Sequence, residues 1–132
     1  MELHRCLPAI VEADEEFAHL LTLAFLKAGL SAGNIRYYPS GESALEELLA
    51  AGAIPPSAML LDLDLPGISG LAVLERIRSR ETLAAMPAFL FSVRNDSESI
   101  TRAGTLGAKA YWLKPQGFSP IWRIVRGILE SL

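Results

Sequence analysis

Polar side chains that can act on a phosphoryl group follow four short apolar runs of this chain. They are three carboxylates, one hydroxyl and one amine, at Glu12, Asp62, Asp64, Ser92 and Lys114. A carboxylate can attack phosphorus as a nucleophile and form an acyl phosphate. The charge on the phosphoryl oxygens is then balanced by Mg²⁺, an ammonium group or hydroxyl donors, and Mg²⁺ prefers hard oxygen ligands. This set of residue types therefore predicts phosphoryl transfer, provided that the fold brings the ends of the runs together.

The elements that must position these side chains are five apolar runs, which we interpret as strands. The runs are Leu7–Val11, Ile35–Tyr38, Ala58–Leu61, Ala88–Phe91 and Ala110–Leu113. Segments with apolar residues at helical spacing separate the runs and follow the last one. Strands and helices that alternate five times predict an α/β fold, with a five-stranded parallel sheet and helices on both faces. In such a sheet the site lies beyond the carboxyl ends of the strands, which is where the polar side chains fall.

Capping residues indicate where several of these helices begin and end. Asp14, Ser40 and Ser69 each precede a helical pattern and are expected to be N-caps. Gly29 and Gly107 follow the last apolar residue of a pattern, where a glycine commonly ends a helix.

The composition is that of an ordinary globular domain. The chain has 132 residues, 51% hydrophobic and 20% charged, so it can bury one core and is too apolar for disorder. We expect a single domain over residues 1–132 with no output domain. The net charge of −3 argues against nucleic acid as the main partner. Since we find no targeting segment and no long apolar stretch, we expect no membrane contact and a cytoplasmic location.

The motif around Asp62 resembles the phospho-acceptor motif of the receiver domain of two-component response regulators. Ser92, 30 residues after Asp62, matches the switch hydroxyl of that family, and Lys114, 22 residues further on, matches its lysine. Tyr111 falls at the position of the family's aromatic switch residue. The resemblance covers nearly the whole chain and rests on the ordered set of motifs with these spacings.

Two further segments narrow the resemblance within the CheY-like superfamily. Ser79–Met86 and Leu106–Tyr111 look most like the small stand-alone regulators that partner bacterial phytochrome kinases. The resemblance implies a flavodoxin-like (βα)5 fold. It also implies a phosphorelay response regulator that is not an enzyme, apart from its own phosphorylation and dephosphorylation.

The resemblance implies a role for each matching residue. Asp62 would accept a phosphoryl group from a histidine kinase or a phosphotransfer protein. Ser92 and Lys114 would contact the phosphoryl oxygens. Tyr111, with Ser92, would report the change to a partner protein, because the phosphoryl group favours one conformer over another.

The metal site departs from the family at one position. The resemblance implies that Mg²⁺ is held by Glu12, Asp62 and the backbone carbonyl of Asp64. Where the family has a carboxylate that binds the ion directly, this chain has Ala13. The loss of even an indirect metal partner lowers affinity by about 10–100-fold, so we expect Mg²⁺ to be held weakly.

Two variable positions beside the acceptor are interpreted as tuning residues. Asp64 lies two residues after Asp62, and Arg94 lies two residues after Ser92. In the family these positions flank the phosphoryl group and tune its lifetime. Because an acid is missing at Ala13, we hypothesise that Arg94 reaches toward Asp62 or Asp64 and supplies positive charge.

The last helix carries two apolar stripes, one more than a sheet needs. Phe118, Trp122 and Leu129 form the second stripe, which we expect to be exposed and to mark an interface. Receivers commonly signal and dimerise through the face of the fourth helix, the fifth strand and the fifth helix. We therefore expect contacts with a downstream protein or a homodimer there.

Two other functions remain open from the residues alone. Ala13 favours a pseudo-receiver, a binding module of the same fold that works without phosphorylation. The pair Asp62 and Asp64 also allows an aspartate-dependent phosphatase, with one carboxylate as nucleophile and the other as acid.

Overall fold

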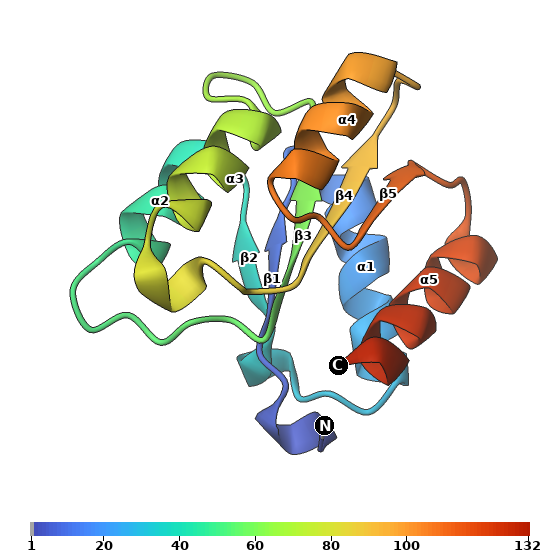
Figure 1. Cartoon of the computed structure of the whole chain (residues 1–132). Coiled ribbons are helices and arrows are strands. Elements are labelled where there is room, and N and C mark those ends of the chain that lie inside the picture. Colours follow the sequence, from blue (N-terminus) through green and yellow to red (C-terminus); the bar gives the residue numbers. More distant parts are fainter. Residues whose placement is uncertain (1) are drawn as a thin grey trace.

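A five-stranded parallel sheet forms the centre of the computed structural model, which describes residues 2–132 (Figure 1). The strands are β1 (Pro8–Val11), β2 (Arg36–Tyr38), β3 (Ala58–Asp62), β4 (Ala88–Ser92) and β5 (Ala110–Leu113). Their order is β2-β1-β3-β4-β5, and every neighbouring pair is parallel. This order is the flavodoxin-like one, in which the chain reverses its direction of travel between β1 and β3.

Five helices cover the two faces of the sheet. They are α1 (Glu15–Lys27), α2 (Gly41–Leu48), α3 (Gly70–Arg78), α4 (Ser97–Thr105) and α5 (Phe118–Ser131). Figure 1 shows α1 and α5 on one face, and α2, α3 and α4 on the other. Short 3-10 turns lie at Leu3–Arg5, Ala32–Asn34 and Glu81–Leu83. The predicted α/β fold is confirmed. No helix within residues 2–132 is long and apolar enough to cross a membrane.

The core has two parts because the side chains of a strand alternate between the two faces. Met59 and Leu61 of β3 pack in the cluster that includes α2 and α3 residues, whereas Leu60 packs with Phe91 and α1 and α5 residues. The inner strands β1, β3 and β4 are buried along their whole length, as parallel strands between two helical layers are. The ends of the most buried strands of the sheet therefore carry Asp62 and Ser92.

The helix ends follow the predicted caps. The Asp14 side chain accepts hydrogen bonds from the amides of Glu16 and Phe17, and the Ser69 side chain accepts from Ala72. Ser40 forms a capping box with Ser43. After α1 the chain turns at Gly29, whose φ of 109° is unfavourable for residues with a side chain.

Some strand ends differ from the predicted runs by one residue. Asp62 and Ser92 are the last residues of β3 and β4, because Asp62 pairs with Phe91 and Ser92 pairs with Leu113. Leu7 and Ile35 lie outside β1 and β2. Asp62 and Ser92 are thus held by the sheet itself rather than by a loop.

Candidate functional site

Glu12, Asp62 and Lys114 meet at the carboxyl ends of β1, β3 and β5. The Lys114 Nζ atom lies 2.8 Å from Glu12 Oε2 and 3.3 Å from Asp62 Oδ2. The exposed fractions of the three side chains are 12% for Lys114, 2% for Glu12 and 3% for Asp62. The structure therefore gathers two buried carboxylates around one ammonium group, from parts of the chain that are far apart in sequence.

The charges in this cluster are strongly coupled. Burial, followed by the neighbouring Asp62 carboxyl group, raises the pKa of Glu12 to about 7, although the hydrogen bonds from Lys114 and from the Asp14 amide act in the opposite direction. Burial also lowers the pKa of Lys114, but the hydrogen bond and charge of Glu12 and the charge of Asp62 outweigh this effect and raise it. Lys114 therefore stays an ammonium group, and an ammonium group can bind the anionic oxygens of a phosphoryl group.

Close backbone packing fixes the position of Asp62. The Asp64 amide donates to Asp62 Oδ1 at 2.8 Å. Gly70, the first residue of α3, approaches the end of β3 so closely that a Cβ atom there would lie 2.3 Å from the Asp62 carbonyl oxygen. A glycine at position 70 is thus needed for α3 to start directly against the backbone of Asp62 and Leu63.

The Asp64 side chain turns toward β4. Asp64 Oδ2 accepts hydrogen bonds from Ser92 Oγ and from the Val93 amide, both at 2.9 Å. Arg94 Nη2 lies 3.1 Å from Asp64 Oδ1. Burial alone would raise the pKa of Asp64, but the hydrogen bonds from Val93, Ser92 and Arg94 lower it. Arg94 thus reaches Asp64 rather than Asp62.

Tyr111 is attached to the same loop after β4. Its hydroxyl donates to the Arg94 carbonyl oxygen at 2.9 Å, and the Arg94 amide donates to Ser92 Oγ at 3.0 Å. The hydroxyl of Ser92 and the ring of Tyr111 are therefore connected through a single residue of the β4–α4 loop.

The residues that could hold a divalent cation fit it only in part. Glu12 and Asp62 offer two facing carboxylates, and the Asp64 carbonyl is a further oxygen. Ala13 packs against the core cluster, and no group of three or more Asp, Glu, His or Cys side chains suited to a metal occurs within residues 2–132. Such a donor set suits Mg²⁺ that keeps several of its waters.

Two contributions to the site carried no signal in the sequence. The Tyr37 hydroxyl on β2 donates to the Glu12 carbonyl oxygen at 3.0 Å, which holds the turn after β1. The Val93 amide is a backbone donor and depends only on the course of the loop. A pattern of side-chain types cannot identify either of them.

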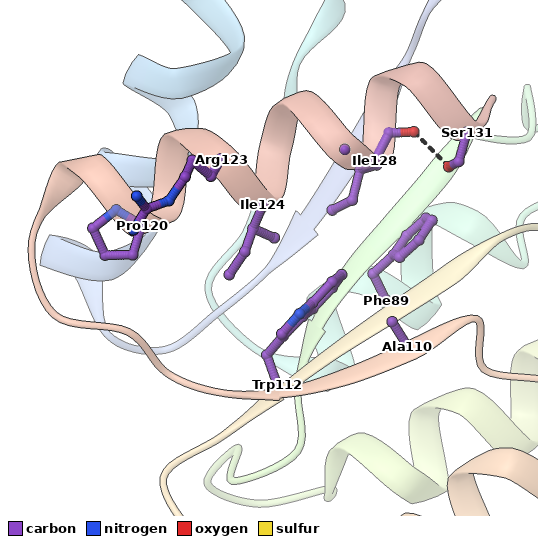
Figure 2. A pocket seen from close by; sticks show the side chains of 9 residues that line it. Phe89, Ala110, Trp112, Pro120, Arg123, Ile124, Ile128 and Ser131 are labelled. Atoms are coloured by element: carbon purple, nitrogen blue, oxygen red, sulfur yellow. Dashed lines mark hydrogen bonds between the residues drawn. The ribbon is translucent and has the colours of Figure 1, made fainter.

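An apolar cavity of about 500 Å³ lies away from this site, between β5 and α5. Figure 2 shows Trp112 and Phe89 facing Ile124 and Ile128 across it. None of the predicted site residues lines this cavity.

The second apolar stripe of α5 is half-buried, contrary to the expectation that it is exposed. The Lys27 ammonium of α1 lies 4.8 Å from the centre of the Trp122 ring, and Phe118 and Leu129 pack against the core cluster of that face. Because α1 lies alongside α5, this stripe belongs to the α1–α5 contact rather than to an open face.

Comparison with protein families gives one match along most of the chain. The family model described as the response regulator receiver domain matches residues 9–126. The chain is 32% identical to the probable methanogenesis regulatory protein FilR2 of Methanothrix harundinacea, over 92% of this chain and 79% of that protein. It is 35% identical to the sensory transduction protein RegX3 of Mycobacterium tuberculosis, over 92% of this chain and about half (49%) of that protein.

A solved structure with a similar fold supports the same family. The phosphorylated cyanobacterial phytochrome response regulator RcpA superposes with a TM-score of 0.81 and 28% identity, over 93% of this chain and 90% of that one. The resemblance to phytochrome response regulators that the sequence indicates is thus also found in the structure.

Proposed function

Because the chain belongs to the receiver-domain family of response regulators, we propose that Asp62 accepts a phosphoryl group from a phosphohistidine of a partner kinase or phosphotransfer protein. An Asp62 carboxylate oxygen attacks phosphorus and forms an acyl phosphate, while the phosphorus–nitrogen bond breaks and the imidazole leaves with its electron pair. The observation that carries this proposal is the buried Asp62 carboxylate with the Lys114 ammonium 3.3 Å away.

The neighbours of Asp62 supply what the transfer requires. Lys114 balances the charge of the phosphoryl oxygens, and Ser92 donates its hydroxyl to one of them. Mg²⁺ held by Glu12, Asp62 and the Asp64 carbonyl would neutralise charge that builds up during the transfer. The related regulator RcpA is described as phosphorylated in its own crystal structure, which supports the same chemistry here.

Intact mass after incubation with acetyl phosphate tests this proposal. We expect a phosphoryl adduct in the presence of Mg²⁺ and none in Asp62→Asn. Asp96→Asn is the matched control, since it makes the same chemical change at a carboxylate in the β4–α4 loop. An adduct that persists in Asp62→Asn, or no adduct in the unaltered chain, would contradict the proposal.

The pseudo-receiver remains a second candidate because Ala13 removes one carboxylate from the metal site. It predicts no adduct at any Mg²⁺ concentration, together with unchanged partner binding in Asp62→Asn. The phosphatase has less support. Its general acid would be Asp64, but hydrogen bonds lower the pKa of that carboxyl, so it carries no proton to donate near neutral pH.

We further propose that the signal leaves through the face of α4, β5 and α5, and that a second copy of the chain is the occupant of this face. Ile100 of α4 and Leu113 of β5 are large exposed apolar side chains, which is the kind of surface that a protein partner covers. A histidine kinase or phosphotransfer protein remains the expected donor.

A further inference from the structure

We propose that Asp64 is a positioning residue. In the unmodified protein its carboxylate takes the place of the phosphoryl group, because it binds the hydrogen-bond donors that the phosphoryl group would use. This inference rests on the proposed function of Asp62 as acceptor. The inference adds that the Asp64 carboxylate competes with the phosphoryl group for the same hydrogen-bond donors.

The donors around the Asp64 carboxylate are those that an anionic oxygen binds best. Oδ2 accepts from the Ser92 hydroxyl and the Val93 amide at 2.9 Å each, and Oδ1 accepts from the Arg94 guanidinium at 3.1 Å. A hydroxyl, a backbone amide and a guanidinium together are a typical set of phosphate donors. The β4–α4 loop is therefore already arranged around a negative charge.

The Asp62 and Asp64 carboxylates are connected through the backbone amide of Asp64. The Asp64 amide donates to the Asp62 carboxylate, while the Asp64 side chain accepts from Ser92. In the proposed function Ser92 donates to a phosphoryl oxygen on Asp62. Its single hydroxyl proton can serve only one acceptor at a time, so phosphorylation must take Ser92 away from Asp64.

The arrangement also extends to the switch residue. The Arg94 amide donates to Ser92 Oγ, and the Arg94 carbonyl accepts from the Tyr111 hydroxyl. Asp64 thereby keeps the β4–α4 loop and Tyr111 ordered before any phosphoryl group arrives. A ligand shifts a conformational equilibrium only if it binds one conformation more tightly than the other. Because Asp64 already holds the β4–α4 loop in an ordered conformation, the phosphoryl group changes this loop less than it would without Asp64.

The first test needs neither metal nor phosphorylation. Hydrogen exchange of the Val93 amide is measured by NMR in the unmodified, metal-free chain. We expect exchange in Asp64→Ala to be about tenfold faster or more, since the hydrogen bond to a charged acceptor is lost, and an intermediate rate in Asp64→Asn. Core amides such as Leu60 serve as an internal reference and should not change. Unchanged exchange at Val93 would overturn the inference.

The second test measures competition directly. Beryllofluoride is titrated as a phosphoryl mimic in the presence of Mg²⁺, and its binding to Asp62 is followed by NMR. We expect about tenfold tighter binding to Asp64→Asn, because a weaker acceptor releases Ser92 and Arg94. Arg102→Ala is the control, since it breaks an exposed ion pair with Glu75 away from the site.

The outcomes separate this inference from the proposed function. Equal beryllofluoride affinity in the unaltered chain and in Asp64→Asn would overturn the competition and leave Asp62 as acceptor. Failure of both proteins to bind beryllofluoride, with no acetyl phosphate adduct, would overturn the proposed function and the competition together. The Val93 exchange result would still show whether Asp64 orders the loop.

Discussion

At the residue scale, Lys114 is the group on which the charge balance of the site depends. Its ammonium lies 2.8 Å from Glu12 Oε2 and 3.3 Å from Asp62 Oδ2, the oxygens of two buried carboxylates. Removing one partner of a buried ion pair leaves an uncompensated charge, which destabilises a protein far more than losing an exposed pair.

We therefore expect Lys114→Met to lower the free energy of unfolding by on the order of 3 kcal/mol at pH 7. Urea unfolding would measure the change. Lys109→Met is the matched control, because Lys109 is exposed and near the same strand, and it should change stability by less than about 0.5 kcal/mol. Equal effects of the two substitutions would contradict the role given to Lys114.

Ala13 offers a gain-of-function prediction at the same scale. Ala13→Asp adds a carboxylate next to Glu12, and we expect Mg²⁺ to bind about 10–100-fold more tightly. Calorimetric titration would measure the affinity. Ala13→Asn, which adds similar bulk without charge, should give a much smaller increase; a gain equal to that of Ala13→Asp would mean that charge at this position does not contribute.

At the element scale, Gly70 determines how closely α3 approaches the end of β3. A Cβ atom at position 70 would lie 2.3 Å from the Asp62 carbonyl oxygen and 2.6 Å from Leu63 Cα, and both atoms belong to the backbone. The strand end would have to move, because a backbone cannot rotate away as a flexible side chain can.

Gly70→Ala should therefore destabilise the fold by about 1–3 kcal/mol, in the range of overpacked cores. It should also slow phosphorylation of Asp62 by acetyl phosphate. Gly104→Ala in α4 is the control, since nothing lies within 4 Å of its Cβ position, and it should stabilise the helix by about 0.5–1 kcal/mol. Thermal unfolding of Gly70→Ala and Gly104→Ala distinguishes crowding at the end of β3 from a general effect of replacing a glycine in a helix.

The start of α4 depends on pH through Asp96. The hydrogen bond from the Ser99 hydroxyl, followed by that from the Glu98 amide, lowers the pKa of the Asp96 carboxyl below its ordinary value. A depressed pKa means that the cap contributes stability above pH 3.8 and loses it as the pH falls through the folded-state pKa. NMR titration should find the Asp96 midpoint below the ordinary value of an aspartate, and Asp96→Asn should remove the loss of Glu98 amide protection, measured relative to intrinsic exchange, that accompanies protonation of Asp96.

The sheet and the convergence of Glu12, Asp62 and Lys114 at its edge were predictable from the sequence, because strands and their polar ends are read from short-range patterns. Buried strands such as β3 read as continuous apolar runs, and their polar ends mark where the side chains converge. The contacts of Asp64 and Trp122 were not predictable in this way. The Asp64 carboxylate could face either Asp62 or Ser92, and the position of Trp122 depends on how α1 packs against α5.

At the scale of the whole molecule, the exposed apolar residues of α4 and β5 define the proposed face for self-association. We expect the phosphorylated chain to dimerise, and Ile100→Glu or Leu113→Glu to weaken the dimer by about tenfold. Analytical ultracentrifugation would measure the association. Ile54→Glu is the control, because Ile54 is an exposed isoleucine in the loop before β3. Equal weakening by all three substitutions would contradict this face.

The ion pair between Lys114 and Glu12 joins residues 102 positions apart in the chain. Contacts of such high sequence separation close late in folding, after the loops between them have been ordered. A nascent chain that lacks β5 has the Asp62 carboxylate without the Lys114 ammonium group. Under the proposed function, phosphorylation of Asp62 would therefore require that synthesis has passed Lys114.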